Sequence, residues 1–357
     1  VNGKLPAEAE VHDMVAPLWR NTGIGRRQLV PCADLAHVHW HVLDGDDHPS
    51  IRTSATDQPD LIDLVHSIDA DYTLCRSADT RTPECFPGRI SYMMEPGAPP
   101  FPTPGAALVF QPRLFDHGYL PPLDADQRDR LDASLAPAWA NLCESHAVDA
   151  EPLEDVPPDR KIIALPLEYE HEENFFRIHS VFPSNCHWVA SLAEAMDDDV
   201  FLAVTNHPLN ELHVDNSALY DLVESLPGRA AMVSGRTEHM ARQCDGMIVG
   251  NSKCFAIGAF FGTPMLRQST FETDAWLNVH QDLGDFIGAI RAGSGGRARE
   301  EDLRAWFAFH IANNVLDATL ADVTAAEIFD RLDRPVDPAR WETGFERYRQ
   351  FQPELFA

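Results

Sequence analysis

The chain has 357 residues, of which 44% are hydrophobic and 9% aromatic, so it can bury more than one core and wholesale disorder is excluded. Lys and Arg number 28 against 56 Asp and Glu, and the net charge of −28 argues against nucleic acid or an anionic membrane as partner. Seven cysteines without a CxxC pair argue against a disulfide framework and predict a cytoplasmic protein. No apolar run reaches about 18 residues, so no transmembrane segment is expected.

Proline and glycine interrupt residues 83–105, which excludes a helix and predicts an ordered loop between short strands at 89–94 and 107–111. Glu95 lies in this loop. A carboxylate held there can act as a general base toward a hydroxyl, and an ordinary loop residue is the alternative. A helix is expected over 124–145.

The segment that follows this helix is acidic, contains proline and has no apolar period, which predicts a linker over 147–160. We therefore expect an N-terminal α/β domain over residues 1–150, on the acceptor side. A second domain is expected over 161–300. A helical tail over 301–357 is expected to pack back on the first domain.

Strands and helices alternate in the second half. The expected strands are 161–167, 200–205, 230–233, 246–250 and 264–267, and the expected helices between them are 183–196, 217–226, 237–243 and 253–261. Alternation of this kind predicts βαβ units and a parallel sheet of the α/β class. Ligands of such sheets bind at the carboxyl ends of the strands, so polar residues there are the candidates for a site.

His207 follows the strand at 200–205 and precedes Pro208, which restricts the backbone. An imidazole N–H in this place can bind a phosphate oxygen, and a hydrogen-bonded loop histidine is the alternative. Asn251, Ser252 and Lys253 follow the strand at 246–250. A hydroxyl, an ammonium group and the start of a helix suit a phosphate, and a Ser252 that only caps its helix is the alternative.

Two other groups of residues are candidates for a site. Glu168 opens an acidic stretch over 168–174, where a contact with a sugar competes with a solvated loop. A strand over AHVHWHV would place three histidines on one face, with three aspartates nearby (His37, His39, His41, Asp44, Asp46 and Asp47). A polar strand face is the preferred interpretation, and no metal site is expected.

Four stretches resemble the bacterial capsule polysaccharide biosynthesis family, which includes Kdo (3-deoxy-manno-octulosonic acid) transferase-like proteins. In chain order they are ISYMMEPGAPPFP with VFQPRLFDHG, KIIALPLEYEHEEN, FLAVTNHPLN and CDGMIVGNSKCFAIGAFFGTPML. Family members typically carry an E-x-G segment, a PLQ strand, an HP pair and an NSTxGxEALxxGxPV stretch. The resemblance covers about residues 88–120 and 161–270.

This resemblance implies a GT-B architecture, in which two Rossmann-like domains face a cleft. It implies a glycosyltransferase that moves a Kdo-like sugar from a nucleotide sugar, with CMP or its equivalent as the nucleotide, to a glycan or glycolipid acceptor in surface polysaccharide synthesis, with no metal or other cofactor. Carried over, Glu95 and His207 become catalytic residues. The donor site includes the remaining candidates (His207, Pro208, Asn251, Ser252, Lys253 and Glu168).

The chain departs from the family pattern at several positions. Glu168 replaces the glutamine of PLQ, Lys253 stands where threonine is usual, and the helix after it has no acidic residue. Two alternatives therefore stay open: a GT-B-like nucleotide-sugar 2-epimerase, and a non-catalytic sugar-binding protein on the same fold.

Overall fold

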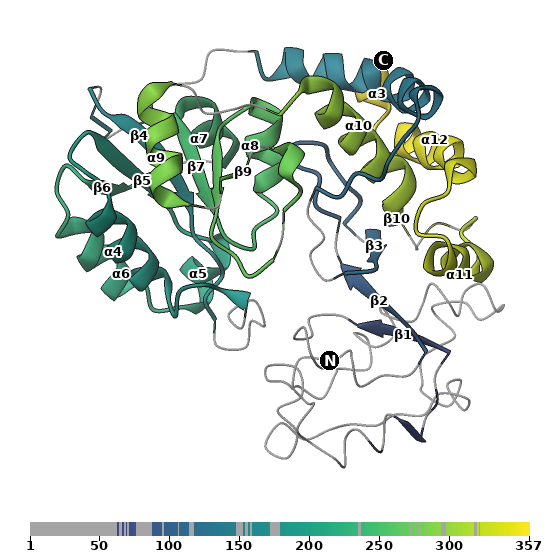
Figure 1. Ribbon diagram of the computed structural model, residues 1–357, viewed down its shortest axis with the longest axis horizontal. Coiled ribbons are helices and arrows are strands. Elements are labelled where there is room, and N and C mark those ends of the chain that lie inside the picture. Colours follow the sequence, from purple (N-terminus) through teal and green to yellow (C-terminus); the bar gives the residue numbers. More distant parts are fainter. Residues whose placement is uncertain are drawn as a thin grey trace. The chain divides into compact units, whose positions relative to one another are not determined.

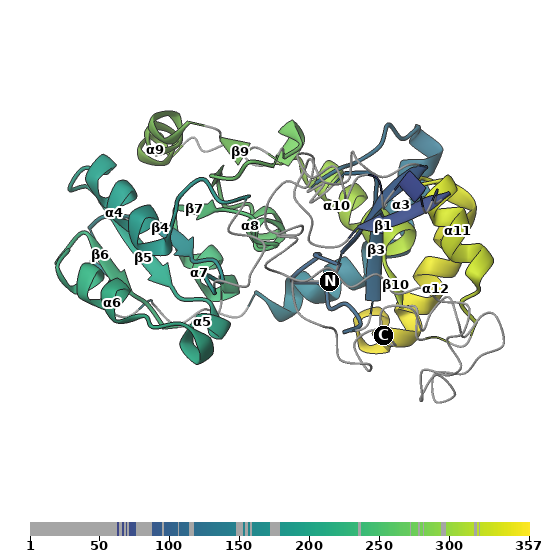
Figure 2. The same ribbon diagram turned by 90° about the horizontal axis from the view of Figure 1, so that it is seen from below.

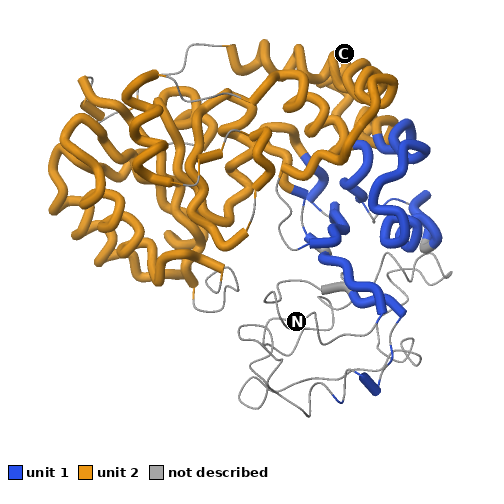
Figure 3. Tube along the Cα trace, in the orientation of Figure 1, with its two compact units in different colours: residues 1–96, 103–115, 312–344 blue, residues 97–102, 116–311, 345–357 orange. Residues whose placement is uncertain are grey.

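The computed structural model describes the chain from residue 71, with gaps at 76–87, 95, 106, 114–117, 148–152, 154–155, 158, 172–178, 235–236, 272, 278, 281, 294–297, 318–319 and 321. Before residue 71 it describes only residues 63, 66, 67 and 69. Glu95 and the histidines at 37, 39 and 41 thus lie outside the described residues. The chain divides into two compact units (Figure 3). Unit 1 comprises Val1–Pro96, Thr103–Phe115 and Ala312–Gly344, and unit 2 comprises Gly97–Pro102, Asp116–Ile311 and Phe345–Ala357.

The described part of unit 1 contains a mixed four-stranded sheet in the order β1-β2-β3-β10. Its strands are β1 (Tyr72–Cys75), β2 (Arg89–Met94), β3 (Ala107–Gln111) and β10 (Leu316–Asp317). Strands β1 and β2 are parallel, and the other two pairings are antiparallel. A small core around Leu316, Val323 and Ile328 joins β10 to helix α11 (Ala325–Asp333). Residues 312–344 of the expected helical tail therefore belong to unit 1.

Unit 2 contains a parallel six-stranded sheet in the order β6-β5-β4-β7-β8-β9. The strands are β4 (Lys161–Pro166), β5 (Val200–Thr205), β6 (Ala230–Met232), β7 (Gly246–Val249), β8 (Met265–Arg267) and β9 (Val279–His280). In order of appearance along the chain this is 3-2-1-4-5-6, the order of a Rossmann sheet. The α/β class and the parallel sheet predicted from the alternation are confirmed.

Helices cover both faces of this sheet (Figures 1 and 2). One face packs against α4 (Asn185–Ala195), α6 (Ser217–Glu224) and α9 (Leu283–Ala292) in a single apolar cluster that includes Ile248 and Leu266. Alternate strand residues face the other way. Met247 and Met265 contact α8 (Phe255–Phe261) at Gly258, so α8 lies on the opposite face, where it also contacts α7 (Thr237–Gln243).

Helices α3, α10 and α12 lie outside these two faces. Helix α3 (Ala125–Ser145) agrees with the predicted helix to within one residue, and its N-cap Asp124 forms a capping box with Gln127. It packs against α10 (Glu300–Phe309) in a cluster of aromatic rings of unit 2 (Phe101, Trp139, Phe260 and Phe307). The last helix is α12 (Trp341–Phe351). No helix among the described residues is both long and apolar enough to cross a membrane.

The sequence missed one element next to the expected site. Helix α5 (Pro208–His213) occupies what was predicted as a loop after β5. Proline suits the first position of a helix because its missing N–H has no partner there in any case. The aspartates at 197–199 connect α4 to β5. Two of them bind Arg291 at the amino end of β5, opposite the edge where the candidate residues lie.

Candidate functional site

The chain reverses its winding direction between β4 and β7, the neighbouring strands at the centre of the unit 2 sheet. Ligands of open α/β sheets bind at the carboxyl edge of such a switch point. Glu168 lies just beyond β4, and Asn251 lies just beyond β7. The Glu168 carboxylate accepts the backbone N–H of Asn251 and, at 2.7 Å, the hydroxyl of Ser180. The switch point is thus bridged by one acidic side chain.

The main-chain oxygen of Glu168 extends this bridge to two more segments. It accepts a hydrogen bond from the amide of Asn185 at the start of α4 (2.9 Å) and another from Asn210 in α5 (2.8 Å). Both asparagines are buried. One residue therefore ties together the segments that follow β4, β5 and β7.

Glu168 sits in an electrostatically unusual place. Burial raises the pKa of its carboxyl, and the hydrogen bonds from Asn251 and Ser180 and the charge of Arg267 act in the opposite direction. Arg267 is only 4% exposed, and burial lowers its pKa to about 10. It donates from Nε to the carbonyl of Gly250 at 3.2 Å. A buried cation and a half-buried acid thus support the chain around residue 250.

Gly250 is needed because Glu168 lies against it. A Cβ at Gly250 would overlap Oε1 of Glu168 and lie 2.8 Å from its Cδ. We expect Gly250→Ala to lower the free energy of unfolding by about 1–3 kcal/mol, as overpacking does. Gly288→Ala in α9 is the matched control, since a Cβ there meets nothing within 4 Å. Chemical denaturation measures both, and equal stability of the two variants would contradict the tight fit.

His207 is the N-cap of α5, and its Nδ1 accepts the backbone N–H of Leu209 at 3.1 Å. An acceptor nitrogen carries no proton, so in the neutral ring the proton is on Nε2. Burial lowers the pKa of the half-buried ring, which favours this neutral form at pH 7. Pro208 follows as the first helical residue. His207 is therefore a fixed imidazole that carries its proton on Nε2.

Ser252 and Lys253 lie in a turn before α8, which begins at Phe255, two residues later than predicted. The Ser252 hydroxyl accepts the backbone N–H of Cys254 at 3.2 Å, and its own proton can be donated elsewhere. The stem of Lys253 lies against Gly97, where an added Cβ would be 2.7 Å from Cδ of the lysine. Lys253 thus packs on the segment that continues the predicted E-P-G loop.

The Asn251 side chain is occupied within the protein. Its Oδ1 accepts the hydroxyl of Ser269, and its Nδ2 lies 3.4 Å from Oε2 of Glu168. Ligand contacts predicted for Glu168 and Asn251 therefore compete with interactions that hold the site together. Asn210, Ser180 and Arg267 contribute to the same network and were not predicted. The only sequence signal for them was the asparagine that ends the FLAVTNHPLN stretch.

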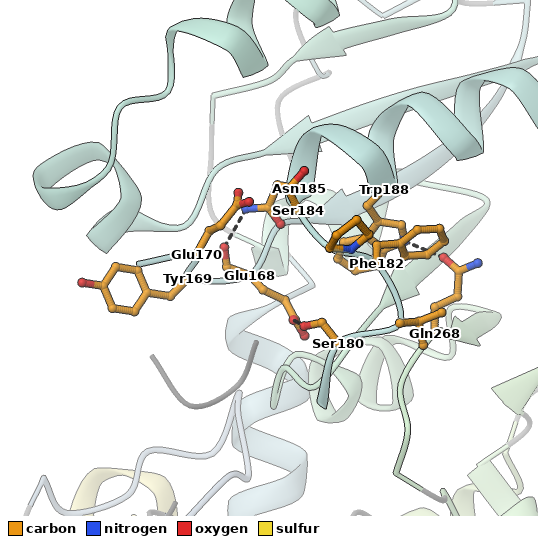
Figure 4. A pocket seen from close by; sticks show the side chains of 11 residues that line it. Glu168, Tyr169, Glu170, Ser180, Phe182, Ser184, Asn185, Trp188 and Gln268 are labelled. Carbon is orange, nitrogen blue, oxygen red and sulfur yellow. Dashed lines mark hydrogen bonds between the residues drawn. The ribbon is translucent and has the colours of Figure 1, made fainter. Parts of the chain in front are cut away.

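A pocket opens beside Glu168, between the start of α4 and the end of β8 (Figure 4). Phe182 and Trp188 stack on one of its walls with ring centroids 6.1 Å apart. The indole N–H of Trp188 donates to Gln268. In the part of the chain that the structure describes, no group of three or more His, Cys, Asp and Glu side chains is arranged to hold a metal ion.

Comparison with solved structures finds two similar proteins from Thermosulfurimonas dismutans. One is described as KpsC, beta Kdo 2,7 transferase (TM-score 0.45, 13% identity, covering 79% of this chain and 91% of that one). The other is described as KpsC, beta Kdo 2,4 transferase (TM-score 0.38, 11% identity, covering 65% and 78%). No family model and no curated protein matches the sequence. Both structures are Kdo transferases, the group that the sequence motifs resemble, but at these values the similarity by itself assigns neither fold nor function.

Proposed function

We propose that this protein is a glycosyltransferase that binds a nucleotide sugar at the carboxyl edge of the unit 2 sheet. The observation that carries the proposal is the bridged switch point. His207, Glu168 and Ser252 follow β5, β4 and β7, three adjacent strands whose ends are tied together through Glu168. Strands two places apart in a sheet are roughly 10 Å apart, a gap that one phosphate with two side chains can fill.

The chemistry suits departure of a nucleotide. Negative charge develops on the phosphate as the sugar leaves, and the Nε2–H of His207 and the hydroxyl of Ser252 are donors to that charge. Loss of one such donor is expected to cost about 2–4 kcal/mol in the transition state. Glu95 is the proposed general base toward the acceptor hydroxyl. The same proposal includes the GT-B arrangement, a CMP-linked Kdo-like donor and a glycan acceptor. It also includes the absence of a metal requirement and a cytoplasmic location.

Thermal unfolding with CMP, UDP and GDP tests the assignment. We expect CMP to raise the melting temperature, with a gain of about 2.7 kcal/mol at 100 times its dissociation constant. His207→Ala and Ser252→Ala should abolish most of this gain. The matched controls are His213→Ala, at the far end of α5, and Ser225→Ala, before β6 at the opposite edge of the sheet.

Two outcomes would count against the proposal. If no nucleotide stabilises the protein, or if the His207 and Ser252 variants respond as their controls do, there is no nucleotide site at this edge. Selectivity for UDP would instead favour the 2-epimerase or a hexose donor. Binding of CMP without turnover of any CMP-linked sugar would favour a non-catalytic sugar-binding protein.

A further inference from the structure

The ring of Tyr169 stacks on the ring of His207, with centroids 5.6 Å apart and planes inclined by 29°. Tyr169 also stacks on His171, with centroids 5.8 Å apart and planes inclined by 16°. Figure 4 shows the Tyr169 side chain directed away from Phe182 and Trp188. Tyr169 also lines that pocket, but its ring lies against the two histidines and not against the aromatic wall.

The backbone on both sides of Tyr169 is held by a single side chain. The amide of Asn210 donates to the carbonyl of Glu168 at 2.8 Å, and its oxygen accepts the N–H of Glu170 at 2.9 Å. Asn210 is 1% exposed, and its own N–H donates to the carbonyl of His207 at 2.9 Å. One buried residue thus fixes the backbone of both stacked rings.

A second group of contacts fixes the loop that carries His207. The side-chain oxygen of Asn206 accepts the N–H of His207 at 2.9 Å and the amide of Asn210 at 2.8 Å. Its amide donates to Glu211 and Asn216. The imidazole plane is nevertheless free to turn about its own side-chain bonds unless something contacts the ring. The bond from Leu209 N–H to Nδ1 holds one edge, and Tyr169 lies against the face.

We propose that Tyr169, held in place by Asn210, is a positioning residue that keeps the His207 imidazole in the orientation in which Nε2 carries the proton. The proposal rests on the proposed function, in which that proton is donated to the phosphate of the bound nucleotide. A donor misplaced by about 1 Å can lose a large part of its effect, so a residue that never touches the ligand can control its binding. Among the residues that the structure describes, the titratable groups on the segments that contact the imidazole include Tyr169, its neighbour Glu170, His171, which stacks on Tyr169, and Glu211 in α5.

The test compares Tyr169→Ala with Tyr169→Phe in the full chain. The first measurement is an NMR titration of the His207 ring without nucleotide, with the signal assigned by its absence in His207→Gln. Removal of the tyrosine ring should let solvent reach the imidazole, raise its pKa toward 6.5 and increase the share of the Nδ1–H tautomer. Phenylalanine keeps the aromatic face and should leave the titration unchanged.

The second measurement is the affinity for CMP by calorimetry. Aromatic pairs contribute about 0.5–1.5 kcal/mol, so Tyr169→Ala should weaken CMP binding by roughly twofold to thirteenfold, while Tyr169→Phe binds as the parent does. An unchanged His207 titration in Tyr169→Ala would overturn the positioning role, and so would unchanged CMP affinity. If the parent protein itself binds no CMP, the proposed function fails, and the NMR titration alone decides whether Tyr169 positions the ring.

Discussion

Replacement of Glu168 by alanine is expected to lower the free energy of unfolding by about 3 kcal/mol, since each buried donor that loses its acceptor costs about 1–3 kcal/mol. The substitution leaves the N–H of Asn251 and the hydroxyl of Ser180 without their acceptor. It also leaves Arg267, a buried cation, without the negative charge that favours its protonated form. Each loss has its own cost because a buried polar group without a partner has given up its hydration.

One further variant separates the role of the Glu168 charge from that of its shape, and another serves as the control. Glu168→Gln keeps the volume and one acceptor oxygen but not the charge, so its loss of stability should be intermediate. Glutamine is also the residue that stands at this position in the family that the sequence motifs resemble. Glu194→Ala, at an exposed position in α4, should change stability by no more than about 0.5 kcal/mol. Urea denaturation with a fluorescence readout measures all three, and a Glu168→Ala variant as stable as Glu194→Ala would refute the bridge.

Acidification is expected to destabilise the protein by about 3 kcal/mol through His310 alone. This histidine is fully buried after α10, stacked on Trp306 with centroids 5.4 Å apart, and burial together with the charge of Lys253 lowers its pKa from 6.5 to about 4. In the unfolded chain the ring takes up a proton below pH 6.5, whereas in the folded protein it stays neutral until about pH 4. The proton therefore favours unfolding, and stability falls as the pH is lowered from 6.5 to about 4.

His310→Gln isolates this contribution because it removes the titrating group. Chemical denaturation of parent and variant at pH 7 and pH 4.5 should show a smaller loss for the variant, with most of the 3 kcal/mol as the difference. His213→Gln, at an exposed position in α5, should lose stability as the parent does. Equal pH dependence of His310→Gln and the parent would contradict the lowered pKa of the buried ring.

The sheet of unit 2 was predictable because each of its longer strands is a short apolar run bounded by turn residues. The predicted strand 200–205 and helix 237–243 agree with β5 and α7 to the residue. Strands β9 and β10 have two residues each, too few to show any period. Helix α5 was missed because His207 and Pro208 were interpreted as loop residues, although they also form a normal helix start.

The sequence predicts residues of the site only where their position at the end of a strand identifies them. The rule that ligands bind at strand ends selected His207 and Ser252, and their role as phosphate ligands stays a prediction. The same rule selected Glu168 as a ligand residue, whereas the structure has its carboxylate and its carbonyl bonded to other parts of the chain. Asn210 and Arg267 gave no comparable signal, because their partners depend on how three strands align in space.

A crystal structure of the protein with CMP tests the central claim most directly. The account predicts that one phosphate oxygen lies within about 3.2 Å of Nε2 of His207 and another within the same distance of the Ser252 hydroxyl, above the junction of β4 and β7. CMP bound elsewhere on the protein, or bound at this edge with its phosphate away from both side chains, would contradict it.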